Sequence, residues 1–199
     1  MKKLFSSILF FAAITSFAQS PIINLEDDDD YKIPGAYYRD TNNRFNAYEG
    51  TYVLATSTIY WKIVLQKKIM QYDNTRYFDL IIGGYQYKVN GVELINTLSD
   101  VNAQYSNPLL HSISCNYFIG HWASPPCSDC GLEELRIMGS IVEPITELAQ
   151  TLTIRKILVN GQEAIKIHLL GSNVYYDVSG PEPPDGFLNA GEFILIKQP

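Results

Sequence analysis

The residues best suited to chemistry in this 199-residue sequence are its three cysteines, Cys115, Cys127 and Cys130. The last two form a Cys-Ser-Asp-Cys motif that can bridge across a tight turn, while Cys115 could pair with either of them after folding. A redox enzyme places such a motif at a helix N-terminus, where the helix dipole lowers the thiol pKa. Here Pro125-Pro126 and Gly131 flank it and indicate a loop. We predict a structural disulfide, with Cys127 and Cys130 as candidates.

A metal site is the alternative use of the same residues. With His121, the three cysteines have the spacing Cys-x5-His-x5-Cys-x2-Cys, which offers four ligands of the kind that tetrahedral zinc accepts. Only the final pair has a spacing common in zinc sites, and an oxidising compartment favours the disulfide. We therefore predict no metal and no cofactor.

Motifs for other reactions are missing from the sequence. It contains no Gly-x-Ser-x-Gly elbow for a serine nucleophile and no glycine-rich loop for a phosphate. No pair of carboxylates stands out among the 21 acidic residues as a glycosidase pair. His168 lies in a strand-like run, on the side away from Ile167 and Leu169, and is expected at the surface. We predict that the protein is not an enzyme.

Four aromatic residues are candidates for a binding site instead: Tyr52, Trp61, Tyr85 and Tyr87. Aromatic rings suit apolar ligands through buried area, and they suit sugars through stacking. The alternative is that these rings fill the core or form cross-strand pairs. The sequence leaves both interpretations open.

The elements that must position these residues are strands. Apolar and polar residues alternate over Thr58–Lys68, and two longer runs, Arg76–Leu98 and Thr151–Leu170, each contain an Asn-Gly pair typical of a type I′ hairpin turn. Gly83-Gly84 inside the Arg76–Leu98 run predicts a bulge or a sharp bend. We predict an all-β protein, an antiparallel up-and-down meander of 8–10 strands that forms a lipocalin-like barrel, with a β-sandwich as the alternative.

A short N-terminal pattern carries a resemblance to lipocalins and fatty-acid-binding proteins. A short turn that Thr41 could cap precedes Gly50-Thr51-Tyr52 and the first strand. This order is similar to the Gly-x-Trp signature with which that superfamily closes the floor of its barrel. Tyr52 stands in place of the tryptophan, and the resemblance implies Lys197 as the cation that covers the ring. The second lipocalin signature, the lipid-binding lid and the C-terminal helix are all missing.

The whole chain also resembles an uncharacterised family of small exported bacterial proteins, a domain of unknown function. The matching features are a leader that ends in Phe-Ala-Gln, the run "YYRDTNNRFNAYEGTYV", and the segments Ile63–Lys68 and Tyr85–Leu98. The resemblance supports the architecture and implies no activity and no functional residues.

The N-terminus predicts export. Residues 1–18 have a basic start, an apolar stretch and a small-x-small cleavage site, which together indicate a secretory signal peptide. Residues 19–40 are predicted to be an extended acidic leader, and residues 41–199 a single β-barrel-like domain. The mature chain has no segment for a membrane span. We expect a periplasmic or secreted protein.

Charge and composition narrow the partners. The net charge is −6, and removal of Lys2 and Lys3 with the signal peptide makes the chain more acidic still, so nucleic acid is not expected to bind. The first hypothesis is a non-enzymatic protein that binds a small apolar or lipid-like ligand inside the barrel. The alternative is a structural or interaction domain of the cell envelope, or a secreted one, that recognises protein or glycan. In that case the irregular region of residues 99–131 is the expected recognition surface.

Overall fold

The computed structural model describes residues 21–27, 33–172 and 186–199. The predicted signal peptide, residues 1–18, lies outside these ranges, as does the run of residues 173–178, whose sequence is typical of a short strand. Within them the chain forms strands β1 (Ile22–Asn24), β2 (Tyr37–Arg39), β3 (Gly50–Ala55), β4 (Ile59–Tyr72), β5 (Tyr77–Val89), β6 (Val92–Asn96), β7 (Ile113–Ile119), β8 (Arg136–Glu143), β9 (Leu148–Val159), β10 (Gln162–Ser172) and β11 (Gly191–Lys197). Four short 3-10 helices are η1 (Leu25–Asp27), η2 (Arg44–Tyr48), η3 (Leu98–Asn102) and η4 (Pro108–Leu110). None of the helices in the described ranges is long and apolar enough to cross a membrane.

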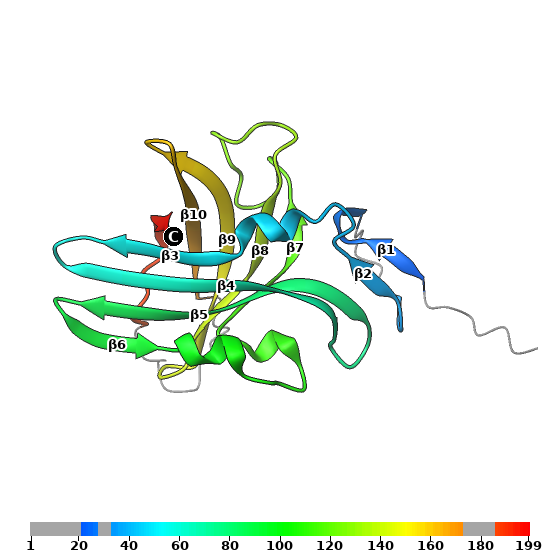
Figure 1. Cartoon of the computed structure of the whole chain (residues 1–199), viewed down its shortest axis with the longest axis horizontal. Helices are drawn as coiled ribbons and strands as arrows, with labels where there is room; N and C mark the ends of the chain where they lie inside the picture. The colour runs from blue at the N-terminus through cyan, green and yellow to red at the C-terminus, as the bar shows by residue number, and fades with distance from the viewer. Residues whose placement is uncertain (1–20, 28–32, 173–185) are drawn as a thin grey trace, which may run out of the picture.

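Eight of the strands close into an antiparallel barrel (Figure 1). The ring runs β3-β4-β5-β7-β8-β9-β10-β11 and returns to β3, so neighbours in the ring follow one another along the chain. Two junctions complete it: β11 pairs with β3, and β5 pairs with β7. This confirms the predicted all-β, up-and-down barrel over the sandwich, and it is consistent with the lipocalin-like resemblance.

The remaining strands lie outside the ring. β6 pairs with β5 as the second arm of a hairpin, while β2 runs parallel to the start of β5 and β1 parallel to β2. β1 and β2 fall in the segment expected as a leader, and Leu25, Ala36 and Tyr38 of that segment are buried in the main core. The packed domain of the described structure therefore begins before residue 41.

The two Asn-Gly hairpins form as predicted. Asn90 and Asn160 have φ angles of 51° and 50°, and the glycine after each also has a positive φ, as a type I′ turn requires. The turn at Asn160-Gly161 fixes the register of β9 and β10, which directs Ile154 and Ile167 inward as paired residues.

The predicted bulge at Gly83-Gly84 is wrong. Both glycines pair in regular register, with Leu65 and Val64 of β4. They allow a close approach instead: a Cβ atom on Gly84 would lie 2.2 Å from the carbonyl oxygen of Thr97, which precedes η3. A side chain at this position would push η3 away from the barrel wall.

Hydrogen bonds hold the chain across both ends of the barrel. At one end, the buried Asp40 carboxylate accepts bonds from the backbone N–H groups of Arg44 and Phe45 and so anchors η2. At the other, the fully buried Glu143 carboxylate accepts from the N–H groups of Phe187 and Leu188 at 2.8 and 2.7 Å. Phe45 and Tyr48 of the first segment and Leu188 of the second are buried in the core cluster.

The closest backbone approach in the wall gives a test of the packing. A Cβ on Gly139 of β8 would lie 1.9 Å from the carbonyl oxygen of Ser114 on β7, whereas one on Gly120 would meet nothing within 4 Å. We expect Gly139→Ala to lower the free energy of unfolding by about 2 kcal/mol or more, because backbone must move, and Gly120→Ala to leave it nearly unchanged. Guanidinium denaturation of both variants measures this. Equal stabilities would show that β7 and β8 do not approach so closely.

Candidate functional site

The four aromatic residues predicted to line a cavity all point into the barrel and are packed there. Tyr52, Trp61, Tyr85 and Tyr87 belong to one buried core cluster. The Trp61 ring meets the rings of Tyr87 and Phe193 edge-on, with centroids 6.0 and 5.1 Å apart. Four pockets stand out on the described residues, and none is lined by any of the four aromatics.

The tyrosine hydroxyls inside the barrel are occupied by the backbone. Tyr52 donates to the carbonyl oxygen of Tyr48 at 3.0 Å, and Tyr85 donates to that of Val142 at 2.9 Å. Burial raises the pKa of Tyr52 to about 12 and that of Tyr85 further, so both stay neutral donors. Lys197, expected over the Tyr52 ring, is its register partner, but its ammonium binds Glu163 at 2.8 Å.

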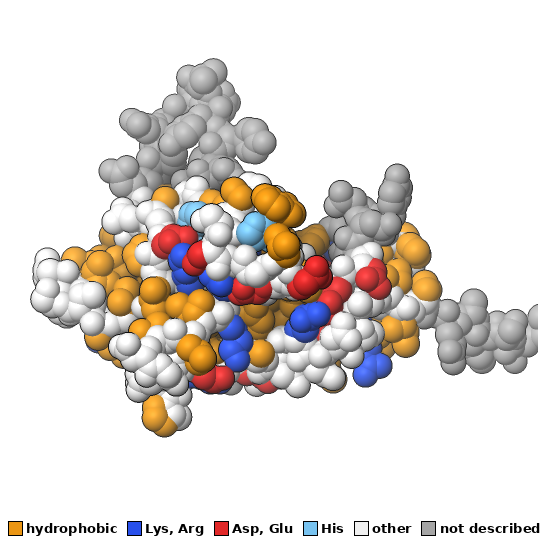
Figure 2. Space-filling view, turned by 90° about the horizontal axis from the view of Figure 1, so that it is seen from above, with side chains coloured by type: hydrophobic (Ala, Val, Ile, Leu, Met, Phe, Trp, Pro, Cys, Tyr) orange, Lys and Arg blue, Asp and Glu red, His pale blue; other side chains and the backbone are white. Residues whose placement is uncertain are grey.

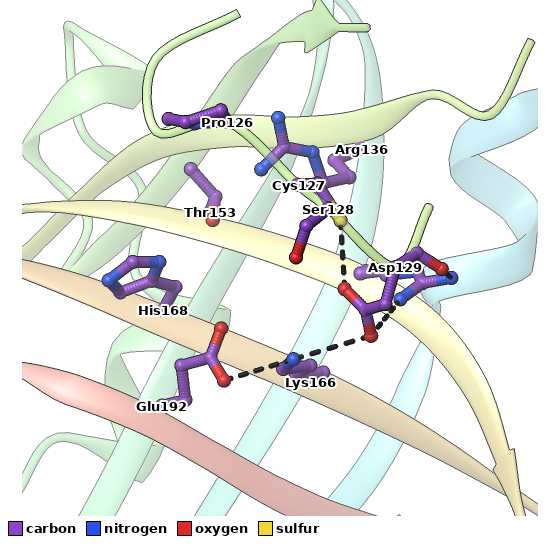
Figure 3. Close-up of a pocket in the computed structure, with 10 residues that line it drawn as sticks. Pro126, Cys127, Ser128, Asp129, Arg136, Thr153, Lys166, His168 and Glu192 are labelled. Atoms are coloured by element: carbon purple, nitrogen blue, oxygen red, sulfur yellow. Dashed lines mark hydrogen bonds and ion pairs between the residues drawn. The ribbon is translucent and has the colours of Figure 1, made fainter. Parts of the chain in front are cut away.

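The most enclosed of the four pockets lies outside the barrel, under the loop that joins β7 to β8 (residues 120–135), and we call it the loop pocket (Figure 3). Its volume is about 180 Å³. Most of its lining is polar or charged: Pro126, Cys127, Ser128, Asp129, Arg136, Thr153, Arg155, Lys166, His168 and Glu192. Seen from above, basic and acidic side chains are intermixed on this face of the molecule (Figure 2).

Strand alternation builds the floor of the loop pocket. β9 and β10 turn isoleucine and leucine inward, so the residues between them face outward. The register places Thr153 of β9 opposite His168 of β10, and His168 opposite Glu192 of β11. In the next row, Arg155 lies opposite Lys166. One polar band therefore crosses three strands.

Ion pairs fasten the loop onto this floor. Arg155 binds both oxygens of Glu134, at 2.6 and 3.0 Å, and reaches Asp129 at 2.8 Å. Lys166 lies 3.0 Å from Glu192 and 3.6 Å from Asp129. The hydrogen bonds from Arg155 hold the pKa of Glu134 below its ordinary value. The resulting stabilisation is present above that ordinary value and is lost as the pH falls through the lowered one.

Arg136 forms the inner wall of the loop pocket and differs from the other two cations. Its Nη2 donates to the carbonyl oxygens of Gly120 and Ala123, at 3.0 and 3.3 Å. Its Nε is buried without a hydrogen-bond partner, and no carboxylate among the described residues forms an ion pair with it. Burial, followed by repulsion from Arg155, lowers the pKa of Arg136.

The predicted disulfide is confirmed and closes one turn of the loop. Cys127 and Cys130 are joined, with their Cα atoms 5.4 Å apart. Cys115 is unpaired and buried in the barrel wall, where burial raises its pKa to about 12. His121 does not join the sulfurs; its Nδ1 contacts the carbonyl oxygen of Cys130 at 3.0 Å. The four residues of the alternative zinc set therefore do not converge on one point: two form the disulfide, one is buried in the barrel wall, and His121 contacts a backbone carbonyl.

The sequence contained part of the signal for this site. Thr153, Arg155, Lys166 and His168 alternate with apolar residues, and this alternation predicted that His168 lies on the outer face of its strand. Such a pattern is equally typical of a solvated strand, and only the loop that folds over it makes a pocket. No hydrogen bond in the described structure links His168 to Ser128 or Thr153, so the pocket contains no assembled nucleophile and base.

Comparison with known proteins gives one match. The model of a family described as "Family of unknown function (DUF6705)" matches residues 1–198. No curated protein and no solved structure shows a significant match.

The cysteine assignments predict a definite labelling pattern. Iodoacetamide should label no cysteine in the native protein, one after denaturation, and three after denaturation with reductant, because Cys115 is buried and the other two are bonded. Mass spectrometry counts the added groups and peptide mapping locates them. Labelling of Cys115 in the native state, or three labels without reductant, would contradict the structure.

Proposed function

The chain belongs to this family of unknown function, and we propose from its geometry that it is a non-enzymatic binding protein that holds a small polar ligand in the loop pocket. The observation that carries the proposal is the position of the polar groups. Arg136, Thr153 and His168 face one enclosed space outside the barrel, while the interior aromatics face one another. Convergent polar groups are one feature of ligand sites, and the space of about 180 Å³ limits the ligand to a small molecule.

The packing inside the barrel weakens the case for an apolar ligand there. A lipid carrier keeps an apolar cavity of about 300 Å³ or more open to solvent. Here Trp61, Tyr52 and Tyr85 are fully buried among neighbouring side chains, and chain segments near both ends of the barrel also pack into the core. A lipid would have to displace these rings and lose their packing energy.

We also propose that the protein works after export. The N-terminal segment has the pattern of a signal peptide, and the Cys127–Cys130 disulfide suits an oxidising compartment. The same disulfide closes a turn of the loop that forms the proposed site. Binding is therefore expected to depend on export to a compartment where the disulfide can form.

Export predicts the mass of the mature protein. Protein recovered from the periplasm or medium of its own host should lack residues 1–18 and begin at Gln19. Intact-mass spectrometry and N-terminal sequencing check this. Full-length protein confined to the cytoplasm, with three free thiols, would contradict it.

Chemical-shift mapping tests the location of binding. Labelled protein is titrated with glucose, glucuronate, succinate and phosphate, and with palmitate as the apolar probe. We expect at least one polar probe to shift the backbone amides of Thr153, Lys166 and His168 saturably, and Thr153→Phe, which fills the pocket, to abolish those shifts. Thermal melting confirms that the variant folds.

The same spectra contain the outcomes that would contradict the proposal. A change in the chemical shift of the Trp61 indole N–H on addition of palmitate would indicate that the ligand binds in the barrel interior. A response to none of the probes at the pocket amides would remove the polar-ligand proposal.

A second candidate function has one observation in its favour. Trp122 is 80% exposed on the loop, with its ring edge-on to His121 at 4.4 Å, and Leu132 of the same loop is 70% exposed. An exposed tryptophan beside a polar pocket offers a stacking surface to a glycan or a protein. The indole N–H of Trp122 reports such a partner in the spectra described above.

A further inference from the structure

Arg136 is the most unusual charged group among the described residues of the loop pocket. Its side chain is almost completely buried, since the residue is only 4% exposed, yet it has no carboxylate partner. Arginines this deeply buried are normally paired, because the loss of hydration costs several kcal/mol unless a counter-charge offsets it. Glu134 and Asp129 attract Arg136 only at longer range, because no carboxylate among the described residues lies within ion-pair distance of it.

A purely structural role explains only part of this side chain. Nη2 binds two loop carbonyls and so holds residues 120–123 against β8. A neutral donor would serve for those bonds. Nε remains buried without an acceptor, which is costly for a polar donor. The chain supplies no acceptor for Nε and no carboxylate within ion-pair distance of the guanidinium among the described residues.

The two neighbouring cations of the loop pocket differ from Arg136, because both already form ion pairs. Arg155 is held by Glu134 and Asp129, and Lys166 by Glu192 and Asp129. These two cations are outnumbered by the three carboxylates, and Arg136 is the one cation lining the pocket that forms no ion pair with a described carboxylate. The hydroxyl groups of Ser128 and Thr153 line the same space, and Figure 3 shows both turned into it.

We propose that the loop pocket binds a small molecule through an oxyanion group, a carboxylate, phosphate or sulfate, whose oxygen accepts from the Arg136 guanidinium and from the Ser128 and Thr153 hydroxyls. This rests on the function proposed above and names its ligand class. Charge-assisted bonds to a guanidinium are among the strongest polar contacts in proteins. The part of the 180 Å³ space near His168 and Glu192 takes the polar remainder of the ligand.

The size and charge of the pocket limit the ligand further. Asp129 and Glu192 line it with carboxylates that repel a second negative group. A ligand with one acidic end and a hydroxyl or amino group at the other therefore fits better than a polyanion. Binding by one cation and two hydroxyls is expected to be of moderate strength and weakened by salt.

The test observes Arg136 directly in the intact disulfide-bonded protein. Sodium phosphate, sulfate and acetate are titrated in turn against sodium chloride at matched ionic strength, and proton–nitrogen spectra follow the arginine Nε–H signals. We expect the Arg136 Nε–H signal and the Thr153 amide to shift saturably with at least one of the three anions and not with chloride. A response to acetate would indicate a site that accepts carboxylates, whereas a response to phosphate or sulfate alone would indicate a site for tetrahedral oxyanions.

Three variants then measure the contribution of the Arg136 guanidinium to anion affinity. Arg136→Gln should weaken binding of the active anion by about tenfold or more, the value of one strong charge-assisted bond. Arg136→Lys, which keeps the charge without the Nε donor, should weaken it less. Arg39→Gln removes the same charge from an exposed position and should change affinity by less than about twofold.

The outcomes separate this inference from the proposed function. If glucose or another neutral probe shifts the pocket amides while no anion moves the Arg136 Nε–H, the oxyanion inference is overturned and the polar pocket stands. If Arg136→Gln folds and binds the anion as well as the unaltered protein, the inference is also overturned. If no probe reaches the pocket, both proposals fall. The direct titration needs no variant, so a misfolded Arg136→Gln does not block the test.

Discussion

The whole molecule depends on a short seam between β5 and β7. Three residue pairs join these strands, Ile81–Cys115, Ile82–Ser114 and Gly83–Ile113, and they turn an open meander into a ring. A Cβ on Gly83 would lie 3.2 Å from the Ile113 Cβ across this seam and 2.7 Å from the Val64 carbonyl oxygen of β4, so a side chain there would crowd both neighbouring strands. Closure then divides every strand into an inner and an outer face. It also explains why Cys115, a seam residue, is buried and unpaired.

Closure decides where function can lie. A ring of eight strands is narrow enough for side chains to fill, and here Tyr52, Trp61 and Tyr85 fill it. Segments held on buried carboxylates, Asp40 near one end and Glu143 near the other, also pack into the core. The pocket that we propose as a ligand site is on the outer wall, where a loop rather than the sheet supplies its second side.

The loop pocket shows how three cations of similar chemistry take different roles. Arg155 and Lys166 project from strands and bind the carboxylates that fasten the loop. Arg136 stands at the start of β8, beneath the loop, and faces carbonyl oxygens that cannot balance its charge. Because the chain satisfies the first two and not the third, the third is the group from which recognition is expected to start.

The sequence by itself determined the class of fold and the local chemistry. Alternation and the Asn-Gly turns are local signals, set by backbone sterics over a few residues, so the hairpins and the all-β barrel could be predicted. The Cys127–Cys130 bridge could be predicted for the same reason, since three residues of spacing bring the sulfurs together. Only the tertiary structure decided that Tyr52 and Trp61 are buried in the interior and that Arg136 lies under the loop without an ion pair to a described carboxylate. Both facts depend on contacts between residues far apart in the chain, and no local pattern records which side chains will meet or which charge will be left without a partner.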